Sequence, residues 1–259
     1  MDQYVKPAVW RWEDENNAPS GNRPTAGSRF EQTLPRGEHR FQVYSLATPN
    51  GIKVPILLEE LLELGHQADY DLFKVDIGKG DQFGSEFVAL NPNSKIPVLL
   101  DQETGINVFE SANILLYLAE QFSALIPIDL AERTQVLNWL FWQTGAAPFV
   151  GGGFGHFFHY APTAQQYPID RYTMETKRQL DLLDQQLAQH AYVAGKEYSI
   201  ADVAIWSWYG RLLDGNLYPG AADFLDGQSY THVLAWAEKI KNRPAVQRAL
   251  AKEYQPMEG

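Results

Sequence analysis

The chain is predicted to fold as an α/β half followed by an all-helical half. Strand signals occur between residues 41 and 109 and then stop, whereas helical spacing of apolar residues continues to about residue 242. The length of 259 residues is enough for one large or two modest domains with an ample core. Apolar residues make up 45% of the chain and aromatic residues 13%, which indicates a globular protein rather than a disordered one.

Residues 1–40 are expected to form an extended N-terminal arm. Prolines recur there among glycine, asparagine and charged residues, and such a segment does not form a packed helix or strand. Val9, Trp10 and Trp12 indicate that the arm lies against an apolar surface.

The α/β half is expected over residues 41–123. A helix after the turn at 48–51 carries apolar residues at helical spacing from Ile56 to Leu64, with Pro55 tolerated in its first turn. The order β-α-β-α-β-β-α places crossover helices over a mixed sheet. The other predicted elements are strands at 41–46, 70–77, 97–101 and 107–109 and helices at 85–90 and 111–122.

A linker near 124–129 leads into an all-helical domain over residues 129–259. Ser199 and Asp202 form a capping-box-like helix start, with Asp202 in place of the usual glutamate. Helices are predicted at 131–142, 170–189, 200–213 and 231–242.

Charge and hydropathy exclude several classes of partner. With 21 Lys and Arg against 32 Asp and Glu, the net charge of −11 argues against nucleic acid as a main partner. No apolar run approaches the roughly 18–20 residues of a membrane span, and Met1-Asp2-Gln3 does not begin a signal peptide. The expectation is a cytoplasmic protein with no membrane partner.

The chain contains no cysteine. A disulfide framework, a thiolate zinc site and a C-x-x-C redox pair are therefore all impossible. If this protein handles disulfides, the reactive sulfur must arrive with a ligand.

The segment 91–118 carries the strongest chemical signal. The Ile96-Pro97 bond precedes a strand, and an X-Pro bond can be cis at little cost, which turns backbone polar groups outward. Glu110 and Ser111 open an apolar helix, whose unpaired N–H groups attract a carboxylate. This combination predicts a site for a ligand with a peptide backbone and a free carboxylate, although Ser111 could instead be an ordinary N-cap.

Further motifs extend this signal from about Trp10 to Arg248, nearly the whole chain. The motifs are Y-S-L-A-T-P-N-G (44–51), D-Q-F (81–83), I-P-V-L-L-D (96–101), V-F-E-S-A-N-I-L-L-Y-L (108–118), N-W-L-F-W (138–142), G-A-A-P-F-V-G-G-G-F-G-H-F (145–157) and Y-S-I-A-D-V-A-I-W (198–206). Together they resemble the bacterial Nu-class, YghU-like glutathione transferases, a group of disulfide-bond oxidoreductases. The resemblance implies a thioredoxin-like N-terminal domain followed by an all-helical glutathione transferase C-terminal domain.

The resemblance implies that Thr48 and Asn50, with Pro49 between them, lie at the ligand sulfur. A hydroxyl and an amide beside a helix N-terminus can donate hydrogen bonds to a thiolate. From the residues alone, T-P-N-G is an ordinary turn. Tyr44 and Ser45 are rival activators, because other classes use tyrosine or serine, but Tyr44 lies within the strand and is expected to pack.

The implied ligand is glutathione, and further residues would hold its peptide. Glu110 would pair with the γ-glutamyl ammonium, and Ser111 with the carboxylate. Ile96, in the Ile96-Pro97 pair, would bond the cysteinyl backbone, while Lys95 could face the glycyl carboxylate or could be a solvated charge.

Some relatives hold two glutathiones, or one glutathione disulfide, in one site. Gln82 is carried over as a polar contact, with a surface loop residue as the alternative, and Asn22 of an N-R-P motif would reach the ligand from the arm. Arg171 is the candidate for a second carboxylate, and Arg178 lies two turns further along the same face but could instead pair with Glu175 or Asp181.

Two stretches in the helical half have open interpretations. The relatives carry glutamine directly before G-A-A-P-F, whereas here Thr144 takes that position and the glutamine is Gln143, which puts this polar contact in doubt. The glycines of 151–155 lack a P-loop lysine and are expected to let two backbones approach closely. His156 and His159 lack a clear third metal ligand, so no metal is expected; aromatic lining of the substrate side or packing is the alternative.

The leading hypothesis is a glutathione-dependent oxidoreductase that reduces small disulfides, with weak peroxide reduction as a companion activity. The alternatives are conjugation of glutathione to electrophiles and a non-catalytic regulator with the same fold. A homodimer is expected, as the resemblance implies. Neither the physiological substrate nor the redox state of the resting ligand follows from the sequence.

Overall fold

The structure is a computed structural model that describes residues 5–12, 21 and 23–257. Its first half is built on a four-stranded sheet in the order β2-β1-β3-β4. Strand β1 is parallel to β2 and antiparallel to β3, and β3 is antiparallel to β4, so the sheet is mixed as expected. The strands are β1 (Phe41–Ser45), β2 (Tyr70–Lys74), β3 (Val98–Asp101) and β4 (Ile106–Phe109).

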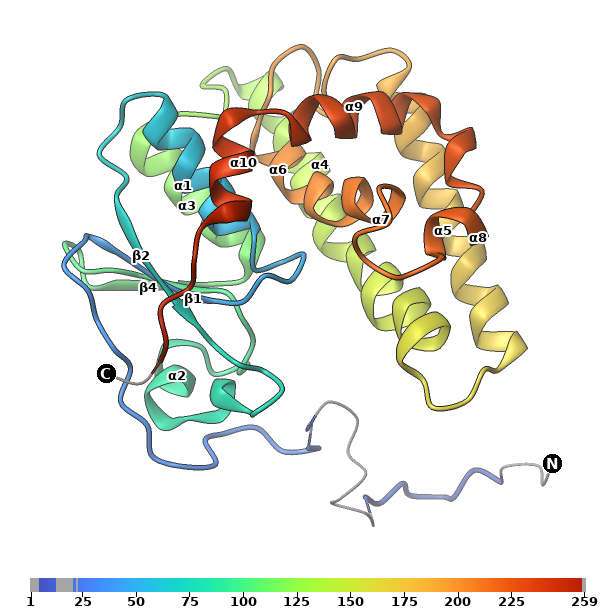
Figure 1. Ribbon diagram of the computed structural model, residues 1–259, viewed down its shortest axis with the longest axis horizontal. Coiled ribbons are helices and arrows are strands. Elements are labelled where there is room, and N and C mark those ends of the chain that lie inside the picture. The colour runs from blue at the N-terminus through green and yellow to red at the C-terminus, as the bar shows by residue number, and fades with distance from the viewer. Residues whose placement is uncertain (1–4, 13–20, 22, 258–259) are drawn as a thin grey trace.

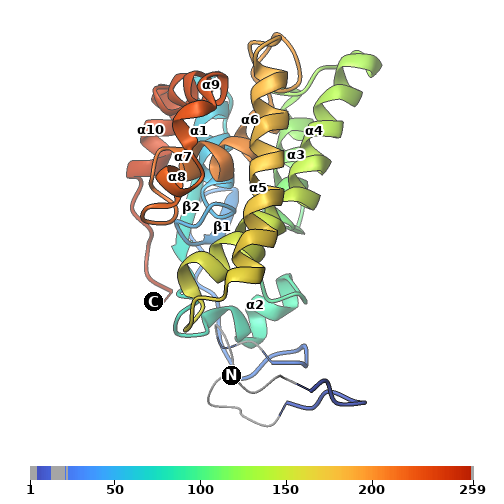
Figure 2. The same cartoon turned by 90° about the vertical axis from the view of Figure 1, so that its right-hand side faces the viewer.

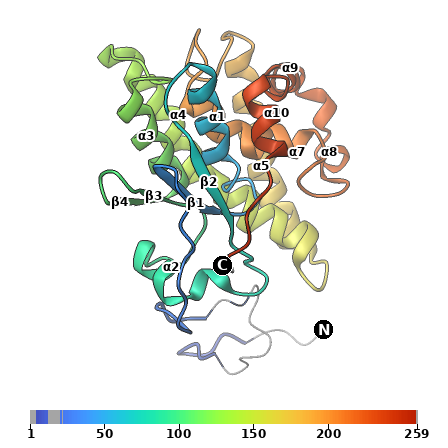
Figure 3. The ribbon, with the colours of Figure 1, turned by 60° about the vertical axis from the view of Figure 1, so that its left-hand side comes forward.

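Helices cover both faces of this sheet, which gives the thioredoxin-like arrangement (Figures 1 and 3). Helices α1 (Lys53–Glu63) and α3 (Ser111–Phe122) pack on one face, and α2 (Ser85–Leu90) lies on the other. All five residues of β1 are buried, because this strand is central in the sheet and covered on both sides. Strand β2 ends at Lys74, earlier than predicted, because the Asp76 carboxylate accepts hydrogen bonds from the backbone N–H groups of Gly78 and Lys79 and forms a turn.

The second half is helical throughout the described residues, and Figure 2 shows α4 and α5 running along its length. No helix among these residues is long and apolar enough to cross a membrane. The helices are α4 (Leu130–Pro148), α5 (Gln166–Leu187), α6 (Ile200–Ile205), α7 (Arg211–Leu213), α8 (Ala221–Phe224), α9 (Thr231–Lys241) and α10 (Pro244–Ala251), with π-helices η4 (Phe149–Tyr160) and η5 (Trp206–Gly210) and 3₁₀ turns η3 (Asp81–Phe83) and η6 (Gly227–Ser229).

The glycine-rich stretch lies within the π-helix η4, which continues α4 well beyond the predicted helix end. The structure corrects the expectation of two close backbones. A Cβ atom at Gly151 would meet the ring of Trp208, and one at Gly155 would meet the ring of Tyr218. The glycines therefore make room for aromatic side chains, and π-helical turns of this kind are frequent at functional sites.

The two halves are joined through α1 and α10, which pack against each other. Glu60 on α1 is buried and accepts two hydrogen bonds from Arg243, at 2.6 and 2.7 Å. After α10 the chain returns to the sheet, where Gln255 pairs with the edge strand β2 (Figure 1). An ion pair with a buried carboxylate and an isolated backbone bridge thus hold the two halves together.

The N-terminal arm is only partly packed. Around residue 30 it docks on the loop before α2, because Arg29 donates its N–H to the Phe83 carbonyl and the Phe30 carbonyl accepts from Ser85. By contrast, Val9 and Trp10 are 71% and 61% exposed, so the surface expected to cover them is not provided by the described residues of this chain.

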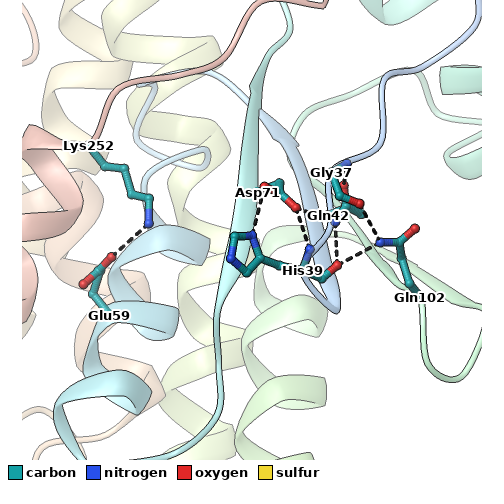
Figure 4. A network of polar contacts seen from close by, with 7 residues as sticks. All are labelled: Gly37, His39, Gln42, Glu59, Asp71, Gln102 and Lys252. Carbon is teal, nitrogen blue, oxygen red and sulfur yellow. Dashed lines mark hydrogen bonds and ion pairs between the residues drawn. The ribbon is translucent and has the colours of Figure 1, made fainter.

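A separate polar network holds the end of the arm to the sheet (Figure 4), and none of its residues lines the cavities described below. The carboxylate of Asp71 accepts hydrogen bonds from the backbone N–H of His39 and from the amide of Gln42. Gln102 donates to the carbonyls of Gly37 and His39. These bonds satisfy polar groups beside β1 and β2, and we assign them a structural role.

Candidate functional site at the junction of the two halves

Two cavities, of about 660 and 480 Å³, lie where the two halves meet, and a third of about 160 Å³ adjoins them within the first half. Asn50 lines all three, and Trp208 of the helical half lines the two larger ones. A set of cavities that converge on one side chain suits a ligand with several arms.

The turn after β1 presents two hydrogen-bond donors at this point. The hydroxyl oxygen of Thr48 accepts from the backbone N–H of Gly51 at 3.1 Å, so its proton is available for another partner. The amide oxygen of Asn50 accepts from the Trp208 indole N–H at 2.8 Å and from the Lys53 ammonium at 2.9 Å. Because an indole and an ammonium can only donate, they fix the amide oxygen and leave the amide nitrogen as the free end.

The N-terminus of α3 is uncapped. Its N-cap residue, Glu110, has φ 66° and ψ 115°, a region that non-glycine residues rarely adopt and that concentrates at functional sites. No side chain caps the first turn, and the Ser111 hydroxyl lies 3.2 Å from the Lys53 ammonium instead. Ordinary N-capping by Ser111 is therefore not what the structure adopts, and the first N–H groups of α3 remain available to an anion.

The loop before β3 forms the opposite wall. The Ile96-Pro97 bond is cis, and Lys95, Ile96 and Pro97 line the smallest cavity together with Glu110 and Ser111. Buried Asn91 shapes this loop by donating to the Lys95 carbonyl at 2.7 Å. The sequence-predicted residues of the two motifs are thus brought together.

Gln82 lies on the 660 Å³ cavity and is 7% exposed. Its amide oxygen has no hydrogen-bond partner among the described residues. Arg29, Lys79 and Lys95 line the same cavity, which gives it a positive wall. The unpaired amide oxygen of Gln82 suits an N–H donor of a ligand, and the three cations suit an anionic group beside it.

Lys53 is a site residue that the sequence interpretation missed. It lines the 480 Å³ cavity, is 1% exposed and donates to Asn50, Ser111 and the Gln143 amide oxygen, the last at 2.9 Å. Burial lowers its pKa to about 7, although the nearby Glu110 carboxylate acts in the opposite direction. A signal existed, because Lys53 lies three and four residues before Ile56 and Leu57 on the apolar face of the helix.

The displaced glutamine has a place in the site. Gln143 is buried and binds Lys53, while Thr144 lines the 480 Å³ cavity. Tyr44 is buried, donates to the Pro35 carbonyl and has its pKa raised to about 12 by burial, which agrees with a packing role. Ser45 is also buried and donates to the Gly51 carbonyl.

Other predicted residues lie apart from the cavities. Arg171 is exposed on α5 and lines none of the three, while Arg178 forms an ion pair with Glu175. Asn22 lies outside the described residues. His156 packs edge-on against Phe157, and the described part of the chain has no cluster of His, Asp and Glu that could hold a metal ion.

Comparison with known proteins defines the class. The family model of the glutathione S-transferase N-terminal domain matches residues 40–120, and that of the C-terminal domain matches residues 166–239. The chain belongs to the glutathione transferase family.

Within this family, the similar proteins include a disulfide-bond oxidoreductase and a protein of unassigned activity. The chain is 56% identical to the disulfide-bond oxidoreductase YghU of Escherichia coli (strain K12), over 95% of this chain and 88% of that protein. It is 62% identical to an uncharacterized GST-like protein of Streptococcus mutans, over 98% of each chain.

Solved structures agree. A crystal structure of glutathione transferase YghU from Streptococcus pneumoniae, complexed with glutathione, matches with a TM-score of 0.96 and 62% identity, over 99% of this chain and 100% of that one. A glutathione transferase from Burkholderia graminis with two glutathione molecules bound per subunit matches with a TM-score of 0.75 and 37% identity, over 83% and 88% of the two chains. One from Pseudomonas putida with one glutathione disulfide bound per subunit has the same TM-score and 39% identity, over 83% and 93%.

Proposed function

We propose that this protein is a glutathione-dependent oxidoreductase that reduces small disulfides. The observation that carries the proposal is the free donor pair of Thr48 and Asn50 in a chain without cysteine: both line the 660 Å³ cavity, and Asn50 lines the other two as well. Relatives of the same type are named disulfide-bond oxidoreductases, which supports the reaction class.

The cavities suit the parts of glutathione. The γ-glutamyl group carries an ammonium and a carboxylate, which match Glu110 and the uncapped start of α3 with Ser111. The cysteinyl backbone would bond Ile96, and the glycyl carboxylate would face Lys95 in the positive cavity, where the free oxygen of Gln82 would accept from a peptide N–H of the ligand. The sulfur then falls near Thr48 and Asn50.

The reaction is thiol–disulfide exchange. The thiolate of glutathione attacks one sulfur of the substrate disulfide, which forms a mixed disulfide and expels the other half as a thiolate. A second glutathione thiolate attacks the glutathione sulfur of the mixed disulfide, which releases glutathione disulfide and the second substrate thiolate. The same thiolate can attack a peroxide oxygen, so slow peroxide reduction is proposed as a companion activity.

Within this scheme, the residues of the chain orient the peptide and favour the anion. Hydrogen bonds from Thr48 and Asn50 to sulfur stabilise the thiolate over the thiol, and each unit of lowered pKa corresponds to about 1.4 kcal/mol. The wall of Tyr160, Trp208 and Tyr218 borders the 480 Å³ cavity and would receive the substrate half.

Thr48→Ala tests the assignment directly. Loss of the donor should lower kcat/KM for a mixed disulfide of glutathione about 10²-fold, in the range found when one preorganised donor to a developing anion is removed. Circular dichroism should report an unchanged fold, and Thr48→Ser, which keeps the hydroxyl, should retain most of the rate. An Ala variant as fast as the wild type would remove Thr48 from the site.

Conjugation of glutathione to electrophiles is the second candidate, because the aromatic wall borders a roomy cavity. Turnover of a small glutathione mixed disulfide should exceed that of a chlorinated aromatic electrophile at equal enzyme concentration. The reverse order would favour conjugation, and glutathione binding without either activity would favour a regulator.

We also propose a homodimer, because α4 and α5 carry large apolar side chains that are exposed in the single chain. Analytical ultracentrifugation should give twice the chain mass of 29.3 kDa. A monomer at micromolar concentration would contradict this proposal. The side chains in question are Leu130, Phe141, Tyr167 and Met174.

A further inference from the structure

The side chain of Asn50 is held from both halves of the molecule. Lys53 approaches its amide oxygen from α1 at 2.9 Å, and Trp208 approaches the same oxygen from the π-helix η5 at 2.8 Å, although 158 residues separate Trp208 from Asn50 in the sequence. The Ser111 hydroxyl lies 3.5 Å from this oxygen. Rotation of the amide would place its NH₂ group against two obligate donors, so the observed orientation is strongly preferred.

Lys53 has the hydrogen-bond partners that an ammonium group requires. Its three donors have three acceptors, on Asn50, Ser111 and Gln143, and it forms no ion pair among the described residues. A buried cation without an ion-pair partner is costly, and a role in packing alone would be met by an apolar side chain. The arrangement is instead suited to hold an acceptor in one orientation.

Trp208 is held just as firmly. It is 9% exposed, and its ring lies so close to Gly151 of η4 that an added Cβ would stand 2.5 Å from it. Glycine at this position therefore leaves the space that the indole occupies. The contact places a π-helix of the helical half directly behind the donor turn of the other half.

We propose that Lys53 and Trp208 are positioning residues that fix the Asn50 amide so that its nitrogen donates to the ligand sulfur. The inference rests on the proposed function and deepens it. Without either residue the amide can rotate, and its oxygen then repels a thiolate that the nitrogen would stabilise. The consequence is a bound thiol with a higher pKa, in a site that still holds the peptide.

The test is the pKa of the glutathione thiol on the protein, measured by pH titration of the thiolate ultraviolet difference absorbance. Trp208→Phe keeps an aromatic ring and the net charge but removes the donor. It should raise the thiol pKa by about one unit, a tenfold fall in the thiolate-to-thiol ratio at neutral pH. Lys53→Met keeps the chain length, removes the charge and should raise this pKa at least as much.

The effect of Trp208→Phe is then measured in a protein that already carries Asn50→Ala. If Trp208 acts through the Asn50 amide, Trp208→Phe should add nothing to the thiol pKa of the Asn50→Ala protein. A full additional shift in that background would overturn the proposal, and so would single variants whose thiol pKa equals that of the wild type.

Glycine variants provide a matched pair if Lys53→Met does not fold. Gly151→Ala should displace Trp208 and raise the thiol pKa, whereas Gly145→Ala, which meets no atom within 4 Å, should leave it unchanged. Equal values in both glycine variants would contradict the inference. Wild-type protein that binds no glutathione or turns over no disulfide would contradict the proposed function itself, so the two failures are distinguishable.

Discussion

Lys53 and Asp202 are both charged groups buried in the same molecule, and they differ in what surrounds them. Burial lowers the pKa of Lys53 to about 7 and raises that of Asp202 to about 6, so in both cases burial disfavours the charged form. Asp202 accepts four hydrogen bonds, from the backbone N–H groups of Val193 and Ser199, the Ser199 hydroxyl and the Trp236 indole. Lys53 has three acceptors, on Asn50, Ser111 and Gln143, and all three of these residues line the 480 Å³ cavity with it.

The comparison separates a charge that holds the fold from one that serves a site. Every bond of Asp202 ties one part of the helical half to another, and Asp202 lines none of the three cavities. Lys53 instead joins α1, α3 and α4 around an opening that can admit an anion. A shifted pKa alone would not distinguish these roles, whereas the partners do.

The largest expected effect is that of Asp202→Ala on stability. Four donors would lose their acceptor in the core, so the free energy of unfolding should fall by roughly 3–5 kcal/mol. Urea unfolding followed by circular dichroism measures it, with exposed Asp223→Ala as the control expected within about 0.5 kcal/mol of wild type. A loss below about 1 kcal/mol would mean that the buried network is not structural.

Lys53 should make stability depend on pH. Its pKa in the folded state is below the unfolded value of 10.5, so between about pH 7 and 10.5 the unfolded chain binds more protons. Stability of the wild type relative to Lys53→Met should therefore rise with pH, by about 2 kcal/mol between pH 7 and 9. The penalty is largest at and below pH 7, where the folded protein keeps the buried charge.

Urea unfolding of both proteins at pH 7 and pH 9 measures this difference. Saturation with glutathione should flatten the slope, because a bound thiolate favours the ammonium and raises its pKa. If the free energy of unfolding changed equally with pH in the two ligand-free proteins, Lys53 would not be desolvated in solution.

The sequence predicted those parts of the site that lie at element boundaries. Thr48 and Asn50 follow a strand, and Ser111 begins a helix, so the topology alone brings these ends together. The capping box at Ser199 was likewise readable and is confirmed. Such features depend on neighbours in the chain, which a single sequence records.

What the sequence could not predict depends on distant packing. Trp208 resembles any apolar residue of a helix, and its bond to Asn50 appears only when the halves dock. The π-helix η4 was missed because its hydrophobic residues also fit an ordinary helix or loop. For Arg178 the sequence offered two partners at a spacing of three residues, Glu175 and Asp181, and the structure shows the pair with Glu175.

The smallest effects should come from the exposed arginines of α5. One of them forms an ion pair within the helix, and the other is a candidate ligand contact. Arg178 donates two hydrogen bonds to Glu175, so Arg178→Ala should cost at most about 0.5 kcal/mol of stability and leave ligand binding unchanged.

Arg171 has no ion-pair partner among the described residues and is the candidate for a second carboxylate. Arg171→Ala should weaken glutathione disulfide binding about tenfold by calorimetry, or about 1.4 kcal/mol, while reduced glutathione at one equivalent is unaffected. Equal affinities in the two arginine variants would place the second carboxylate elsewhere.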